Sequence, residues 1–283
     1  MRVFLSILIA LIAGAGSTLV LTAAIRAFGE LRGGLFVAVL LIVLAAVLAG
    51  VVAVTVGLSP AGVLVVGAVH LLGGVSVLAG QFTYPFVWGV AGDLSFGVEA
   101  VGIAGLALGL LLIGAGLGAL HLRRGSAGGT VAAVLLQLIV AVPAAIVAIV
   151  AMGVVFSQVF LFAAPADPLA VAVSIVAALA LGAVALTLRW SGIGFLAGSV
   201  VVAIVGGIWL AAPYTAAEVL PYSIGLGAVR IGQYGLLLFA AATMLGLWAG
   251  AAIRRRRAPR PGAAVDFAYV AGHAPAGQPL PPV

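Results

Sequence analysis

The sequence predicts an all-α polytopic integral membrane protein with about eight transmembrane helices. Hydrophobic residues make up 65% of the 283 residues, and only 6% are charged. A helix needs about 20 mostly apolar residues to cross a bilayer, and the chain contains eight separate runs of about that length. Hydrocarbon cannot hydrogen-bond the backbone, whereas a helix satisfies its own amides, so these runs are expected to be helical.

The eight runs follow one another with short polar or Gly/Pro-containing segments between them. They are Val3 to Ile25, Leu35 to Leu58, Ala61 to Leu78, Val98 to Leu120, Val131 to Met152, Leu169 to Leu188, Ile193 to Ala212 and Ile231 to Ile253. None of the connecting segments is long enough for a soluble domain. We therefore predict one transmembrane domain over residues 1–257.

The two ends of the chain carry different signals. The first run resembles a signal peptide, with Arg2 before an apolar stretch and small residues at Ala13 and Ala15. Because the apolar stretch continues to Ile25, we expect a retained span, with cleavage as the alternative. Residues 258–283 are rich in Pro, Ala and Gly and are predicted to form a disordered cytoplasmic tail.

The distribution of arginine predicts the orientation. All twelve basic residues are Arg, and five of them lie between Arg254 and Arg260. Basic residues in short loops are retained on the cytoplasmic side. Placing both termini inside puts nine Arg inside and three outside. We expect a multi-pass protein of a bacterial cytoplasmic membrane, because a chain without Lys and rich in Ala, Gly and Val is typical of high-G+C bacteria.

The chain also contains a possible internal repeat. A shift of 128 positions brings Ser95 and Gly97 onto Ser223 and Gly225, and it aligns the fourth run with the eighth. This predicts a 4+4 arrangement with repeats 1–128 and 129–257, parallel to each other because each has an even number of spans. Shared composition is the alternative explanation.

Glycine pairs at GxxxG spacing predict close helix packing. The fourth run holds Gly105 with Gly109 and Gly114 with Gly118, and the eighth holds Gly246 with Gly250. Small residues let two helix backbones approach closely in lipid. We expect these faces to pack inside one protomer, with a dimer interface as the alternative.

Two polar residues mark a candidate intramembrane site. His70 lies in the middle of the third run, and Gln137 lies in the fifth. An intramembrane ionisable residue can serve a proton or ligand pathway, and His titrates near neutral pH. The competing interpretation, which we favour, is that both side chains hydrogen-bond a neighbouring helix.

A second candidate site lies at the predicted outer end of the spans. Its residues combine aromatic rings with opposite charges: Tyr84, Trp88, Asp93, Glu99 and Arg230. Such a cluster can bind a lipid or isoprenoid, and Asp93 with Glu99 is a candidate acid and base pair. An aromatic belt at headgroup depth is the simpler interpretation. Glu99 and Arg230 also form a candidate ion pair between the two repeats.

These observations favour a non-enzymatic accessory or scaffold component of the membrane. A transporter or channel for a small or lipophilic solute is the alternative, and a lipid-acting membrane enzyme is the second one. The sequence predicts no cofactor, no metal site, no catalytic residue and no nucleic-acid partner, and it contains no Cys. The expected partners are a membrane protein and anionic lipid headgroups at Arg254, Arg255, Arg256 and Arg257.

Overall fold

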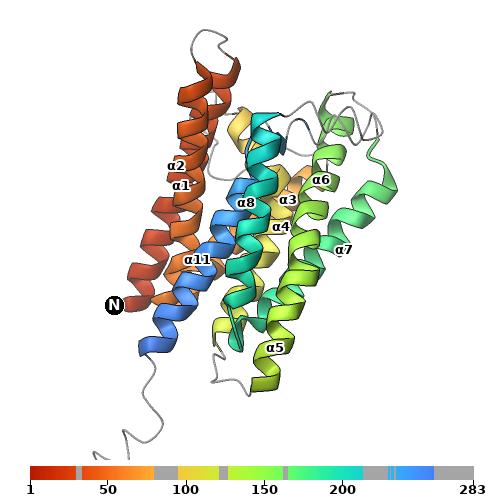
Figure 1. The fold of residues 1–283 in the computed structure, drawn as a ribbon. Helices are drawn as coiled ribbons and strands as arrows, with labels where there is room; N and C mark the ends of the chain where they lie inside the picture. Colours follow the sequence, from red (N-terminus) through yellow and green to blue (C-terminus); the bar gives the residue numbers. More distant parts are fainter. Residues whose placement is uncertain are drawn as a thin grey trace, which may run out of the picture.

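A computed structural model confirms the all-α fold and the eight spans (Figure 1). The structure describes residues 1–29, 34–79, 95–120, 127–161, 165–212, 229, 231–232 and 234–257. All eight runs form helices that are long and apolar enough to cross a membrane. The predicted tail, 258–283, lies outside the described residues.

The helices lie side by side along one common direction. The first four spans are α1 (Arg2–Gly29), α2 (Gly34–Val54) with the 3-10 turn η1 (Thr55–Gly57), α3 (Pro60–Leu78) and α4 (Ser95–Leu120). The other four are the continuous helix α5 (Ala127–Leu136), η3 (Gln137–Ala141), α6 (Val142–Phe156) and η4 (Ser157–Leu161), then α7 (Pro168–Ala185) with η5 (Leu186–Arg189), α8 (Ile193–Ala211) and α11 (Leu236–Arg257).

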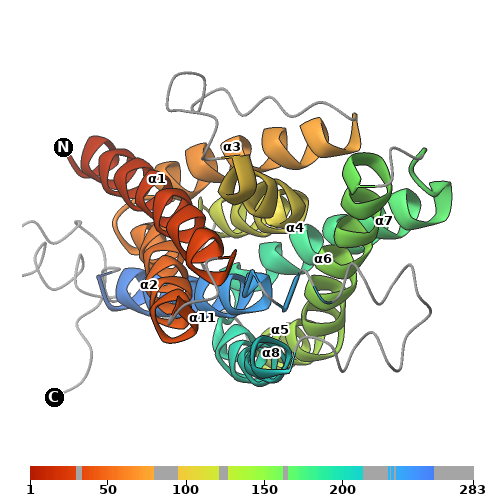
Figure 2. The ribbon, with the colours of Figure 1, turned by 90° about the horizontal axis from the view of Figure 1, so that it is seen from above.

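Two helices, α4 and α11, occupy the middle of the bundle (Figure 2). Helix α4 packs against α3 and α7, and α11 packs against α2 and α8. More of α4 is buried than of any other span. The first and second groups of four helices therefore meet through their last helices, each of which also contacts the second helix of the other group.

Glycine forms the closest of these contacts. Gly105 and Gly109 of α4 face α3, where a Cβ built on Gly105 would lie 2.5 Å from the carbonyl oxygen of His70. Gly114 and Gly118 face the end of α7, and Gly246 and Gly250 of α11 face α2. The three predicted glycine pairs thus pack inside one protomer, as expected from their small size.

The fifth and eighth spans differ from their predicted boundaries. The fifth continues past Met152 to Leu161 and includes two π-helical segments, η3 and η4. Pro143 has no N–H, and one extra residue per turn in η3 adjusts the backbone just before it. The eighth regular helix begins at Leu236, because Gly235 adopts a positive φ of 61° that interrupts the helix.

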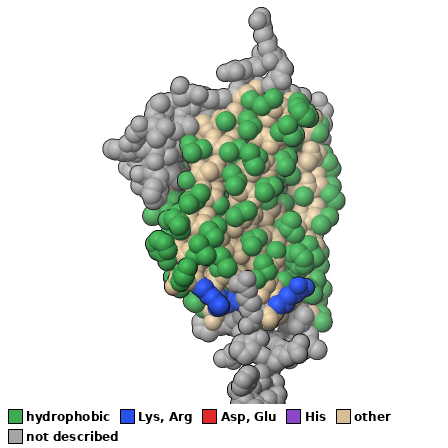
Figure 3. Space-filling view, turned by 90° about the vertical axis from the view of Figure 1, so that its left-hand side faces the viewer, with side chains coloured by type: hydrophobic (Ala, Val, Ile, Leu, Met, Phe, Trp, Pro, Cys, Tyr) green, Lys and Arg blue, Asp and Glu red, His purple; other side chains and the backbone are tan. Residues whose placement is uncertain are grey.

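Basic residues gather at one end of the bundle (Figure 3). Arg2 lies at the start of α1, Arg189 at the end of η5, and Arg254 to Arg256 at the end of α11. The start of the first span and the end of the last lie at this end (Figure 1). We call it the arginine end.

Candidate functional site

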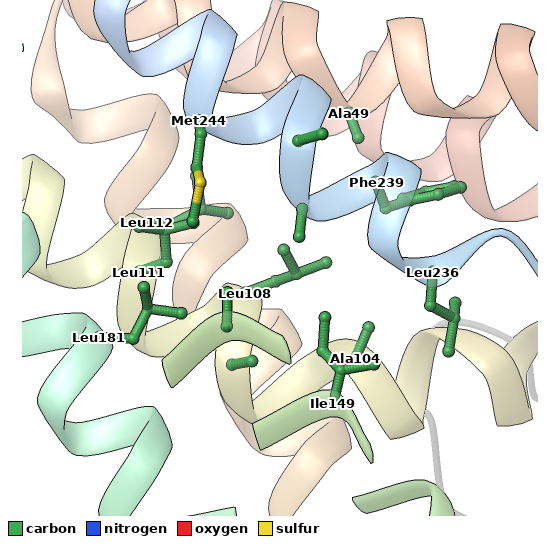
Figure 4. Packing of buried hydrophobic residues seen from close by; sticks show 14 of the residues in the cluster. Ala49, Ala104, Leu108, Leu111, Leu112, Ile149, Leu181, Leu236, Phe239 and Met244 are labelled. Carbon is green, nitrogen blue, oxygen red and sulfur yellow. The ribbon is translucent and has the colours of Figure 1, made fainter. Parts of the chain in front are cut away.

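The centre of the bundle is filled with apolar side chains (Figure 4). Met244 of α11 points toward Leu111 and Leu112 of α4, and all three are at most 2% exposed. Leu108 of α4 and Ile149 of α6 continue the same cluster, with exposed fractions of 3% and 0%. In this part of the structure the two groups of four helices therefore meet through an apolar, buried contact.

Most buried hydroxyl groups in the spans bond within their own helix. Ser17 donates to the carbonyl oxygen of Gly14 at 2.8 Å, and Thr243 donates to that of Phe239 at 2.8 Å. Ser157 and Ser199 do the same in the fifth and seventh spans. These local bonds satisfy the hydroxyl groups without forming a polar path between helices.

One polar contact between helices lies at the turn from α2 to α3. We call it the first turn lock, and it consists of Ser6, Thr55 and Ser59. Ser6 Oγ donates to the carbonyl oxygen of Ser59 at 2.9 Å, and Thr55 Oγ1 donates to that of Val52 at 2.6 Å. Ser59 also caps α3, because its Oγ accepts from the N–H of Ala61 at 3.3 Å.

A second polar contact lies at the turn from α7 to α8. This second turn lock consists of Gln137, Thr187 and Ser191. Gln137 Nε2 donates to Thr187 Oγ1 and to the carbonyl oxygen of Ser191, both at 2.8 Å. Thr187 Oγ1 donates to the carbonyl oxygen of Val184 at 2.6 Å. Gln137 therefore holds the turn between two other helices, as its sequence context indicates.

Each lock depends on a glycine at the start of the following helix. A Cβ on Gly62 would lie 2.6 Å from Ser6 Oγ, and one on Gly194 would lie 2.7 Å from Gln137 Oε1. Any other residue would displace the polar side chain. Gln137 is fully buried, and its Oε1 accepts no hydrogen bond from any residue that the structure describes.

His70 is separate from these locks. It lies in the middle of α3 and is half-buried, and its backbone carbonyl faces Gly105 of α4. Gln137 belongs to the fifth span and contacts η5 and the following turn. The structure therefore does not bring His70 and Gln137 together into one site.

A groove opens on the outside of the bundle between α6 and α7. Its volume is about 480 Å³. Ile139, Pro143 and Val147 line one wall, and Val173, Val176 and Ala180 line the other. Because all lining residues are aliphatic, this groove offers no group for acid–base, nucleophilic or metal chemistry. It suits hydrocarbon.

The arginine side chains that the structure describes lie at the arginine end. Arg255 Nη2 donates to the carbonyl oxygen of Leu188 at 2.8 Å, so this arginine caps the end of η5. Arg189 stacks on the ring of Trp190, with 3.8 Å from its Cζ to the ring centroid. Arg256 is exposed.

The predicted outer-mouth cluster lies outside what the structure describes. Tyr84, Trp88, Asp93 and Arg230 fall in undescribed segments, and only the backbone of Glu99, in α4, is described. Among the described residues no group of three His, Cys, Asp or Glu side chains could hold a metal ion. Gln137 of the second turn lock was predicted as a polar contact between helices, whereas the first turn lock and the groove were not predicted as sites, although Ser59-Pro60 signals a capped turn.

No protein family, curated protein or solved structure matches this chain.

Proposed function

We propose that this multi-pass membrane protein is a non-enzymatic accessory or scaffold component of the bacterial cytoplasmic membrane. The observation that supports this function is the apolar contact between α4 and α11 at Leu111, Leu112 and Met244. A solute pathway between the two groups of helices would need polar or water-accessible surface in this position. The polar locks instead fasten the bundle at one end and support a static role.

The test measures whether water reaches the contact between α4 and α11. Single cysteines replace Leu108, Leu111 or Met244 in this Cys-free chain, and an impermeant methanethiosulfonate reagent is applied to leaky vesicles. A scaffold predicts no modification until the protein is unfolded. Ser126→Cys, in a predicted loop, is the reactive control.

If Met244→Cys or Leu108→Cys is modified at a rate near that of the Ser126→Cys control, the scaffold proposal is wrong and the transport function is favoured instead. Each variant is first checked for normal folding by its elution as a single species in detergent. Replacing Leu or Met by Cys removes apolar volume from the core, so a modest loss of thermal stability is expected in all three variants.

The orientation forms part of the proposal. Arg2, Arg189 and Arg254 to Arg256 share the arginine end, which supports placing that end in the cytoplasm. We expect Ser126→Cys to resist an impermeant maleimide in intact cells and to react after permeabilisation. Labelling in intact cells would reverse the topology.

The same end is proposed to contact anionic lipid. Each Arg near the surface contributes about 1 kcal/mol of attraction to anionic headgroups. Arg255 is engaged with the Leu188 carbonyl, so Arg254 and the exposed Arg256 have more freedom to bind headgroups.

A further inference from the structure

The two turn locks have the same construction. Thr55 and Thr187 each end a span, and each donates at 2.6 Å to the carbonyl oxygen three residues earlier. Their own carbonyl oxygens each accept at 2.9 Å from the N–H three residues later, in Leu58 and Trp190. Thr187, Ser191 and Gly194 follow Thr55, Ser59 and Gly62 at one constant spacing of 132 positions.

A pair of glycine contacts between the groups of helices repeats the same spacing. A Cβ on Gly50 of α2 would lie 3.1 Å from the carbonyl oxygen of Ala242 in α11. A Cβ on Gly182 of α7 would lie 3.1 Å from the carbonyl oxygen of Leu110 in α4. Gly182 follows Gly50, and Ala242 follows Leu110, at the spacing found in the locks.

The agreement extends along both helix pairs. A Cβ on Gly118 would lie 3.2 Å from the carbonyl oxygen of Ala185, and one on Gly250 would lie 3.2 Å from that of Ala53. Gly114 meets the Gly182 carbonyl, and Gly246 meets the Gly50 carbonyl. Every one of these residues has its counterpart at the same spacing.

The sequence carries this spacing through the second and third spans. Within 38–79, the positions that are identical to their counterparts are Ala38, Val39, Ala45, Ala46, Gly50, Val52, Ala53, Thr55, Ser59, Gly62, Leu64, Val69, Gly74, Leu78 and Ala79. They include Thr55 and Ser59 of the first turn lock, Gly62 beside it, and Gly50 and Ala53 at the contact of α2 with α11, and shared composition alone does not select these positions.

We propose that the chain is a tandem duplication of one four-helix unit, and that each unit is the binding partner of the other. Helices α1 to α4 form the first unit. The second unit consists of the continuous helix that begins with α5, followed by α7, α8 and α11. The interface is isologous: α2 binds α11 as α7 binds α4, so one surface of the unit is used twice. Units of four spans are parallel, and their two-fold axis runs along the membrane normal between α4 and α11.

The spacing of 132 is one helical turn longer than the 128 that aligns the fourth and eighth runs by sequence, because a turn holds about four residues. Both shifts therefore superimpose the same apolar and glycine-rich helix faces. The contacts of the turn locks and of the glycines favour the shift of 132 over the shift of 128. Ser6 and Gln137 reach the two turns from the first helix of each unit. Gln137 lies one position before the counterpart of Ser6, and the extra residue of the π-helical segment η3 restores the spacing.

Disulfide cross-linking of the full chain tests this interface. Gly50→Cys with Ala242→Cys places the two Cβ atoms 3.7 Å apart, and Leu110→Cys with Gly182→Cys places them 3.2 Å apart. Both distances are close to the range of about 3.5–4.5 Å that disulfides need, so both pairs are expected to link on mild oxidation. Mass spectrometry of the linked peptides detects the product. The control pair is Val54→Cys with Leu238→Cys. If the repeat spacing were 128, Leu238 would be the counterpart of Leu110 and Val54 the counterpart of Gly182, so this pair would be expected to link.

The proposal requires both pairs of the 132 spacing to link to a similar extent and the control pair to stay reduced. Linking of one pair alone, or equal linking of the control, would overturn it. If a cysteine at Gly50 or Gly182 prevents folding, spin labels at partly exposed positions replace the cross-links. Leu117 with Leu186 and Ala249 with Val54 should then show the same dipolar broadening, and unequal broadening would overturn the two-fold arrangement.

Discussion

Replacing Gly114 by Ala is expected to lower the free energy of unfolding by about 1–3 kcal/mol, the cost of overpacking a close contact. The added methyl group would press on the carbonyl of Gly182 and lie 3.0 Å from the Cβ of Ala185. Neither the backbone carbonyl nor a Cβ can rotate away, so α4 and α7 must separate. The measurement is the thermal unfolding midpoint in detergent, followed by the fluorescence of the four Trp residues.

Gly207 provides the matched control for this substitution. It also lies inside a transmembrane helix, but a Cβ on it would have no neighbour within 4 Å. Gly207→Ala should leave the midpoint unchanged or raise it, because Ala favours a helix over Gly by up to about 1 kcal/mol. Equal effects of the two substitutions would show that the α4–α7 contact is looser than described.

Gln137→Glu is expected to destabilise the protein by about 3–5 kcal/mol, the cost of leaving a buried charge unpaired. The change is nearly isosteric, but it replaces the Nε2 donor by an oxygen. That oxygen would face Thr187 Oγ1, which already donates to Val184, and the carbonyl oxygen of Ser191. Gln137→Leu removes the same hydrogen bonds without adding charge and should cost about 0.6–2 kcal/mol. Thermal unfolding in detergent measures both changes.

Gln158→Glu is the control for the buried carboxylate. Gln158 uses its Oε1 to accept from the N–H of Asp167 at 2.8 Å, and a carboxylate oxygen can accept the same bond. We expect a loss of about 1 kcal/mol or less from the nearby Asp167 charge. A Gln137→Glu variant as stable as Gln158→Glu would mean that water or a counter-charge reaches the second turn lock.

The number of spans and the role of glycine could be predicted from the sequence, because both depend on local composition. The apolar runs are uninterrupted, and pairs such as Gly114 with Gly118 put small residues on one helix face. Gln137 was expected to hydrogen-bond a neighbouring helix, since an amide in hydrocarbon needs a partner. Which carbonyl it bonds could not be predicted, because that depends on how η5 and α8 meet in space.

The position of the eighth regular helix and the correct helix pairs were also beyond the sequence. Gly235 ends one helical segment through its positive φ. In the sequence, nothing distinguishes it from the other glycines among the 40 in the chain. The contacts of α2 with α11 and of α4 with α7 join segments far apart in the chain. The outer-mouth residues, Tyr84 among them, stay a prediction.

The pairing of α2 with α11 sets an order for assembly during synthesis. Gly50 of α2 faces the carbonyl of Ala242 in α11, and most of the chain lies between these two residues. At about 5–20 residues per second, the ribosome needs roughly 10–40 s to deliver the last helix after α2 has emerged. The contact of α4 with α7 can close well before that. Until α11 arrives, the glycine face of α2 lacks the helix that covers it in the folded protein, so the packing of α2 against α11 is a late step of assembly.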